Sequence, residues 1–178
     1  MRRASLEKSG NAMASMERFS AYGLGVDVLD DWRMEFNPKS TREKGDVAFH
    51  SPHDNVFFVS WGKLDDAQGR FETLEQQRDE SVKRIKSNPN IAVAKVELSS
   101  NEMVNGHEGI LSKMVTQKRR GGLLSRSQDP PREVWTVHLH CPQSSRFYVV
   151  YWDIRDGGEY PDVEERFRAI LHSFACHH

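Results

Sequence analysis

Two histidines separated by one residue are the first candidates for chemistry in this sequence. His138 and His140 fall in the segment 133–141, which alternates apolar and polar residues as a half-buried strand does. Residues two apart on a strand point to the same side of a sheet, so these two imidazoles could share a metal ion. A metal site needs a third ligand, and Cys141 falls on the opposite face. We therefore predict that both histidines are hydrogen-bonded or face solvent, and that they hold no metal.

The two cysteines, Cys141 and Cys176, are the next candidates. They lie far apart in the sequence, and neither belongs to a CxxC motif. A chain of this size does not need a disulfide to fold, so we predict reduced, buried thiols. The C-terminal tripeptide Cys176-His177-His178 has the composition of a chelator, but nothing in the sequence requires this tail to be ordered.

An acid–base pair is suggested by His107 and Glu108, which follow Asn105-Gly106. Asn-Gly is a preferred hairpin turn because both residues tolerate positive φ, so a turn is the simpler interpretation. The sequence contains no GxGxxG, P-loop, GxSxG or HExxH motif. We predict no catalytic residue and no cofactor, and an enzyme ranks third among the classes of function considered below.

The most unusual segment is 118–131, a 14-residue interruption between two predicted strands. It is far longer than a common hairpin loop. It is either a solvated loop or a docking loop in which leucines contact a protein partner and basic residues steer it. No aromatic residue lies among the charges, so nucleic-acid binding is not predicted. The candidate contact residues are Lys118, Arg119, Arg120, Leu123, Leu124 and Arg126.

A second candidate surface comes from the segment 146–152, which is aromatic on both faces. If no helix covers one of these faces, Tyr148 and Trp152 would line an apolar groove. Such a groove suits a small ligand or a helix of a partner. Otherwise these side chains, like the other tryptophans, belong to the core.

The composition suits one ordinary globular domain. The chain has 178 residues, a mass of 20.5 kDa, 37% hydrophobic residues and a net charge of −1. A near-neutral chain has no long-range field that attracts nucleic acid or an anionic membrane. No apolar run approaches the length of about 18 residues that a membrane helix needs. The oligomeric state is not predictable from these features.

The first 20 residues are basic and rich in Ser and Ala, but no apolar region follows Arg2 and Arg3. They therefore do not form a secretory signal, and we expect a disordered leader followed by one domain over 21–178. A cytoplasmic location follows by default.

The elements that must position these residues are several strands, a helix, four more strands and a second helix. The helix is expected over 71–87, because apolar residues recur there at helical spacing and Asn88-Pro89 ends the pattern. A second apolar stripe predicts a helix over 162–174. The strands are expected at 24–28, 33–36, 46–50, 56–61, 92–99, 109–117, 133–141 and 146–152.

Strands that follow one another through short turns form antiparallel sheets. The order therefore predicts an α+β domain, with a mainly antiparallel twisted sheet of six or seven strands flanked by two helices.

Three segments resemble the PsbP-like superfamily. The first is an opening strand pair at 22–36, in which Trp32 lacks the proline that precedes it in that pattern. The second is the aromatic strand 56–61 with the helix that follows. The third is the turn Val-Asn-Gly-His-Glu-Gly at 104–109. The superfamily includes the photosystem II extrinsic subunit, a Ran-binding nuclear import factor and uncharacterised prokaryotic proteins.

The resemblance covers about residues 22–175 and implies an α/β/α sandwich. Because the superfamily shares no catalytic residues, it also implies a non-catalytic protein-interaction or assembly module. A small-molecule or lipid carrier that uses an apolar groove is the alternative. The photosynthetic members carry transit and thylakoid signals that this sequence lacks, so a photosynthetic role is not expected.

Overall fold

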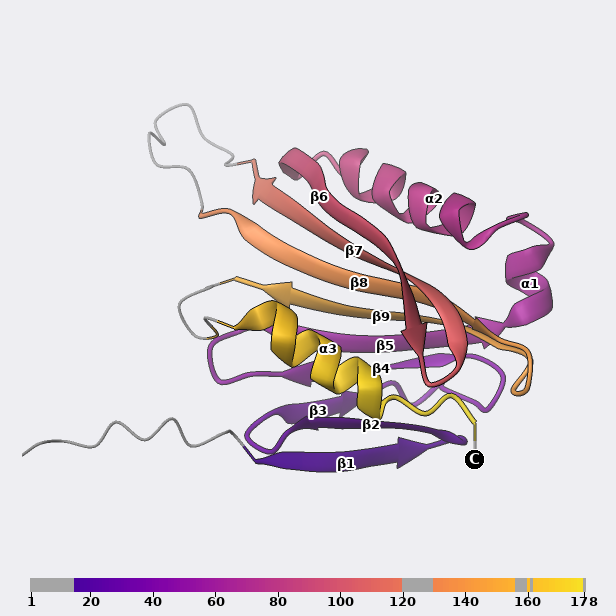
Figure 1. Cartoon of the computed structure of the whole chain (residues 1–178). Helices are drawn as coiled ribbons and strands as arrows, with labels where there is room; N and C mark the ends of the chain where they lie inside the picture. Colours follow the sequence, from indigo (N-terminus) through magenta and orange to yellow (C-terminus); the bar gives the residue numbers. More distant parts are fainter. Residues whose placement is uncertain (1–14, 120–129, 156–159, 161, 178) are drawn as a thin grey trace, which may run out of the picture.

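The computed structural model describes residues 15–119, 130–155, 160 and 162–177 (Figure 1). Within these residues the chain is α+β, with a seven-stranded antiparallel sheet, a separate two-stranded sheet and three helices. The strands are β1 (Met16–Ala21), β2 (Leu24–Leu29), β3 (Arg33–Phe36), β4 (Gly45–His50), β5 (Val56–Lys63), β6 (Ile91–Val104), β7 (His107–Lys118), β8 (Arg132–Cys141) and β9 (Arg146–Ile154). The helices are α1 (Leu64–Gln68), α2 (Leu74–Lys86) and α3 (Val163–Ser173). The predicted α+β class and mainly antiparallel sheet are confirmed.

The large sheet joins two sets of sequential strands. Its order is β3-β4-β5-β9-β8-β7-β6, so β6 to β9 form a meander and β9 pairs with β5 from the first half of the chain. In that central pair Val59 lies opposite Val150. Both have no solvent exposure, so the join between the two halves lies in the core.

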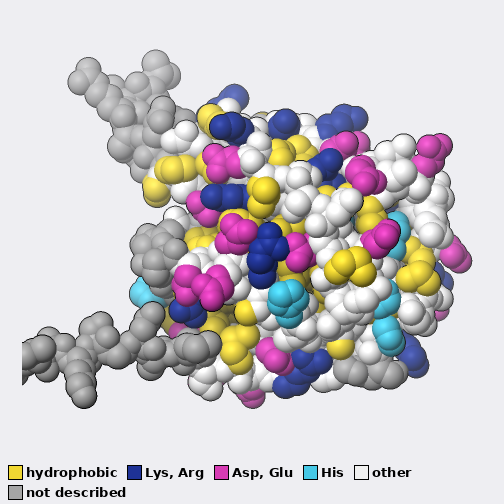
Figure 2. All heavy atoms as spheres, viewed as in Figure 1, with side chains coloured by type: hydrophobic (Ala, Val, Ile, Leu, Met, Phe, Trp, Pro, Cys, Tyr) yellow, Lys and Arg dark blue, Asp and Glu magenta, His cyan; other side chains and the backbone are white. Residues whose placement is uncertain are grey.

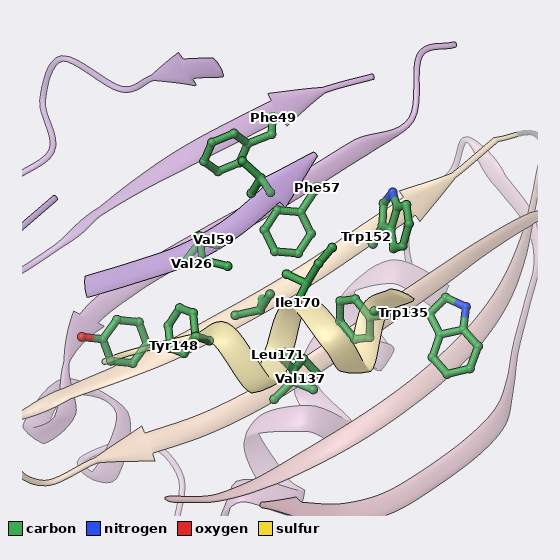
Figure 3. Close-up of a cluster of buried hydrophobic side chains, with 14 of the residues drawn as sticks. Val26, Phe49, Phe57, Val59, Trp135, Val137, Tyr148, Trp152, Ile170 and Leu171 are labelled. Atoms are coloured by element: carbon green, nitrogen blue, oxygen red, sulfur yellow. The ribbon is translucent and has the colours of Figure 1, made fainter. Parts of the chain in front are cut away.

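The core fills the space between one face of this sheet, the strand β2 and α3 (Figure 3). Phe167, Ile170 and Leu171 of α3 are at most 2% exposed. The Phe167 ring lies 6.2 Å from Trp135 of β8 and 6.5 Å from Trp152 of β9. All four tryptophans are buried, as predicted.

Helix α2 lies against the opposite face. Its Ser81 and Gln77 side chains hydrogen-bond to His138 and His140, which alternate along β8 with the core-facing residues. Thr73 caps its first turn by accepting from the Gln76 backbone N–H. Only Gln77 of α2 is fully buried, whereas α3 buries four apolar side chains. The two helices therefore differ strongly in how tightly they pack.

The beginning of the chain differs from the prediction. Met16 to Ser20 belong to β1, although residues 1–20 were expected to be a leader; residues 1–14 lie outside the described part. β1 pairs with β2, and β3 pairs with β4, so β2 and β3 are not the predicted opening pair. The buried pattern of β2 explains its position, because β2 packs on α3 rather than beside β3.

Smaller differences concern the helices and the turn. The helix expected at 71–87 begins at Leu74, and the short helix α1 was not predicted. Asn105 and Gly106 have φ values of 48° and 84° and join β6 to β7, so the predicted hairpin turn is confirmed.

The surface charges and the character of the helices agree with the composition. The face in Figure 2 interleaves basic and acidic side chains rather than separating them. None of the described helices combines the length and the apolar character that crossing a membrane requires.

Candidate functional site

A hollow of about 490 Å³ lies between α2 and the outer face of the large sheet, and we call it the α2 hollow. Strands β7, β8 and β9 form its floor, and α2 forms one wall. Its apolar lining comes from the helix, from the start of β6 and from the three floor strands. These apolar side chains are Val82, Ile85, Ile91, Met114, Val134, Val149 and Tyr151.

The hollow exists because α2 is held to the sheet by polar contacts instead of by a close apolar contact. His138 Nε2 lies 3.0 Å from Ser81 Oγ, and His140 Nε2 lies 2.8 Å from Gln77 Oε1. Val82 and Ile85, the apolar residues that follow along the helix, are only partly buried. A well-packed interior would cover these side chains, so this half of the helix leaves room for another molecule.

Several buried polar atoms at the hollow lack hydrogen-bond partners within the described part of the chain. They are Ser112 Oγ, His138 Nδ1 and Asp153 Oδ1, and all three residues line the hollow. An unsatisfied buried polar atom costs about 1–3 kcal/mol, so native proteins usually provide a partner. A bound molecule with polar groups would supply one here.

His138 is uncharged at neutral pH. Burial, with smaller contributions from the positive charge of Arg78 and from the neighbouring His140, lowers its pKa from 6.5 to about 4. A neutral imidazole offers one donor and one acceptor nitrogen. The ring can therefore hydrogen-bond both to Ser81 and to a ligand without adding charge.

The charged side chains around the hollow are mostly basic. Arg78, Arg84, Lys118 and Arg132 line it, whereas Asp153 is the single acidic residue of the lining. Arg132 lies 3.6 Å from Asp153 and Arg78 Nε lies 2.6 Å from Asp79, so both pairs largely compensate themselves and Arg84 and Lys118 remain. The remaining balance favours an anionic group at the rim of the hollow.

A second group of reactive side chains lies at the other end of the sheet. One ligand atom each from His107, Cys141, Cys176 and His177 lies within 4.8 Å of the other three, and we call this group the Cys/His cluster. His107 begins β7 and Cys141 ends β8, and the other two residues come from the C-terminal tail. Both cysteines are free and buried, as predicted.

The tail is held in place at this cluster by hydrogen bonds. Arg146 donates to the Cys176 carbonyl at 3.2 Å, and Tyr148 Oη donates to the same carbonyl at 2.8 Å. Ala175 pairs with Gly25 of β2 through two backbone hydrogen bonds. These contacts order the tail up to His177, although nothing in the sequence required this.

Burial controls the protonation of the cluster. Together with contact with Cys141, burial raises the pKa of Cys176 to about 12. It lowers the pKa of His107, and His177 contributes to that shift. In the absence of a bound cation, Cys176 is therefore a neutral thiol and His107 a neutral imidazole.

The predicted site residues are distributed as follows. His138 and His140 are hydrogen-bonded, as expected, and Cys141 points to the other face. Lys118 lines the α2 hollow, and the Arg119 backbone N–H donates to Asn90 at 2.7 Å. The other four residues of the predicted docking loop, Arg120, Leu123, Leu124 and Arg126, lie outside the described residues.

The predicted groove at Tyr148 and Trp152 is wrong in its position. Both side chains have no solvent exposure and face α3, which covers that side of β9. The hollow lies on the opposite side, where Val149, Tyr151 and Asp153 alternate with them. The aromatic character of both faces was visible in the sequence, but which helix would pack closely was not.

The sequence also left the Cys/His cluster unrecognised. Its signals were a histidine just after a hairpin turn, a cysteine at a strand end, and a Cys-His pair in the tail. Pairing of β7 with β8, which places Gly109 opposite Leu139, brings the first two together. Bringing the tail to them needs the tertiary fold.

Comparison with known proteins supports the fold and goes no further. No protein-family model matches the sequence, and no curated protein sequence matches it significantly. The protein has a PsbP-like fold: its structure is similar to the solution structure of cyanobacterial PsbP (CyanoP) from Synechocystis sp. PCC 6803. The TM-score is 0.64 at 12% sequence identity, and the match covers 96% of each chain. A protein of unknown function, PA94 from Pseudomonas aeruginosa, gives a TM-score of 0.49 at 10% identity over 89% of this chain and 94% of that one.

Proposed function

We propose that the protein is a non-catalytic binding module that carries a small organic anion with an apolar body in the α2 hollow. The observation that carries this proposal is the hollow itself, with its volume of about 490 Å³ and its mainly apolar walls. Ligand pockets typically measure about 300–1,000 Å³ and combine such walls with a few polar groups.

The chemistry of the lining defines the class of ligand. The apolar side chains of α2 and the three strands would contact a hydrocarbon or aromatic body. Ser112 Oγ and His138 Nδ1 would hydrogen-bond a polar group, since both are buried without partners in the described chain. Arg84 and Lys118 would attract a negative charge at the rim. An amphipathic carboxylate or sulfonate satisfies all three requirements.

This proposal places the carrier, which was the alternative interpretation of the sequence, ahead of a protein-interaction module. Docking of a protein partner on the loop 118–131 stays a prediction. The contacts of α2 and α3 with opposite sheet faces support an α/β/α arrangement as part of the same proposal. A cytoplasmic location is also proposed, because a reducing compartment maintains free thiols such as Cys141 and Cys176.

Binding can be measured with the fluorescent anion anilinonaphthalene sulfonate and with decanoate as a non-fluorescent competitor. We expect one dye molecule to bind per chain and decanoate to displace it. Val149→Trp should weaken dye binding at least about tenfold, because an indole placed on the floor of the hollow occupies the volume that the ligand needs.

Val93→Trp is the matched control. Val93 lies on β6, is 48% exposed and does not line the hollow, so the same substitution there should leave affinity unchanged. Equal dye affinity for the wild-type protein and for a folded Val149→Trp variant would contradict the proposal. Dye binding that decanoate does not displace would contradict it as well.

A further inference from the structure

We propose that the Cys/His cluster binds one Zn²⁺ ion in a tetrahedral Cys₂His₂ site that fastens the C-terminal tail to the end of the sheet. This inference goes beyond ligand binding in the α2 hollow, and the two proposals can fail independently. It also revises the prediction from the sequence that the chain has no metal site.

The distances within the cluster fit this geometry. Cys141 Sγ lies 3.4 Å from His177 Nδ1 and 3.8 Å from His107 Nε2. Cys176 Sγ lies 3.4 Å from His177 Nδ1. A tetrahedral zinc ion with Zn–S bonds of about 2.3 Å and Zn–N bonds of about 2.0–2.1 Å separates its ligand atoms by roughly 3.3–3.8 Å. The other three pairs of ligand atoms lie within 4.8 Å, so they must approach by at most about 1.5 Å to coordinate one ion.

The composition and burial of the cluster favour a structural zinc ion. Thiolate and imidazole ligands suit Zn²⁺, and four protein ligands leave no open position for a substrate. His107, Cys141 and Cys176 are buried, whereas His177 is exposed. The exposed imidazole of His177 gives a metal ion access to the cluster from solvent.

Charge balance also favours the ion. Zn²⁺ would replace the protons of the two thiols, so two protons leave and the site with two thiolates and two neutral imidazoles has no net charge. A site without net charge is compatible with its place at the end of the sheet, where His107, Cys141 and Cys176 are all buried.

The four ligands come from three separate parts of the fold. The Asn105-Gly106 turn places His107 at the start of β7, the end of β8 supplies Cys141, and the tail supplies Cys176 and His177. Zinc would therefore link residues that are 70 positions apart in sequence, from 107 to 177. Because such a site does not exist in the unfolded chain, metal binding should raise the thermal stability.

The test uses the full-length protein, reduced and freed of metal with a chelator, then titrated with Co²⁺ and Zn²⁺. We expect one Co²⁺ per chain, with the visible absorption of tetrahedral cobalt and a thiolate-to-cobalt charge-transfer band. Zn²⁺ should displace the cobalt and raise Tm. A cobalt spectrum without a thiolate band would overturn the proposal.

Variants of single ligands separate this site from other metal contacts. Cys176→Ser should lose about half of the charge-transfer intensity, and Zn²⁺ affinity should fall at least about tenfold. His177→Ala should weaken Zn²⁺ binding by a similar factor; because His177 is exposed, this variant should fold even if Cys176→Ser does not. His178→Ala is the matched control from the same tail and should bind Zn²⁺ like the wild-type protein.

Two results would overturn the assignment. The first is a Zn²⁺ affinity of His177→Ala within about twofold of the wild-type affinity. The second is a loss of Zn²⁺ affinity in His178→Ala that equals the loss in His177→Ala. A reduced protein that binds no metal and forms a Cys141–Cys176 disulfide in air would show that the cluster is a thiol pair instead.

Discussion

At the residue scale, His138 and His140 show how the fold gives different surroundings to two similar residues. His138 and His140 are neighbours on one strand face, and the sequence treats them alike. In the fold His138 is 2% exposed at the α2 hollow, whereas His140 is partly exposed at the first half of α2. Burial therefore makes His138 a neutral polar group that can hydrogen-bond a ligand.

His138 should also make stability depend on pH. Its pKa is about 4 in the folded protein and near 6.5 in the unfolded chain, where it has its ordinary value. Below pH 6.5 the unfolded chain takes up a proton that the folded protein does not. The contribution of His138 is therefore complete above this pH and is lost as the pH falls towards 4.

We expect wild-type unfolding free energy to fall by about 2 kcal/mol from this residue between about pH 7.5 and about pH 5. His138→Gln should remove this part of the pH dependence, while His172→Gln, at an exposed position of α3, should retain it. Urea unfolding at both pH values measures the effect. An unchanged slope in His138→Gln would show that burial does not control the protonation of this histidine.

At the element scale, the two main helices have different roles. α3 has a buried apolar stripe and completes the core, whereas α2 is attached through polar contacts and leaves a hollow beneath it. A weakly held helix moves more easily than a tightly packed one, so α2 rather than α3 is the helix that could shift to admit a ligand.

Truncations should reveal this difference. Phe167→Ala removes a fully buried ring that contacts Trp135 and Trp152, so it should cost about 3–5 kcal/mol. Val82→Ala removes a partly buried side chain at the hollow and should cost no more than about 1 kcal/mol. Amides of α2 should also exchange with solvent faster than those of α3. Similar costs for the two truncations would mean that α2 is packed as firmly as α3.

Elements that a local sequence pattern defines could be predicted, whereas elements whose place depends on tertiary contacts could not. The second half of the sheet follows from alternation, and α3 from its apolar stripe, so both were predicted within a few residues. β1 was missed because its residues are largely exposed and its partner is β2. The apolar groove proposed at Tyr148 and Trp152 fell on the face that α3 covers, because helix packing, rather than the aromatic pattern of 146–152, determines which face stays open.

At the scale of the whole molecule, the fold consists of a sheet with one firmly packed face and one loosely packed face. Cyanobacterial PsbP shares this overall fold at low sequence identity, so the likeness indicates architecture and leaves function to the sites. In this chain the loosely packed face carries the α2 hollow, and the end of the sheet carries the Cys/His cluster.

The loop 118–131 should be unnecessary for folding. Thr116 pairs with Arg132, so replacing the loop with Asn-Gly leaves a three-residue connection that begins at Gln117, a length that hairpins accept. We expect Tm to change by no more than about 4 °C, since closing a shorter loop offsets the loss of the end of β7. Thermal unfolding by circular dichroism checks this. A large loss of stability would mean that the loop packs on the domain.

The central claim is that an organic anion binds between α2 and the sheet, and NMR titration with decanoate tests it most directly. We predict saturable shifts at amides of α2, β7, β8 and β9 around the hollow, with Ser112, His138 and Val149 among them. Amides of β1, β2 and α3 should not shift. Absence of saturable shifts, or shifts centred on α3 instead of α2, would contradict the account.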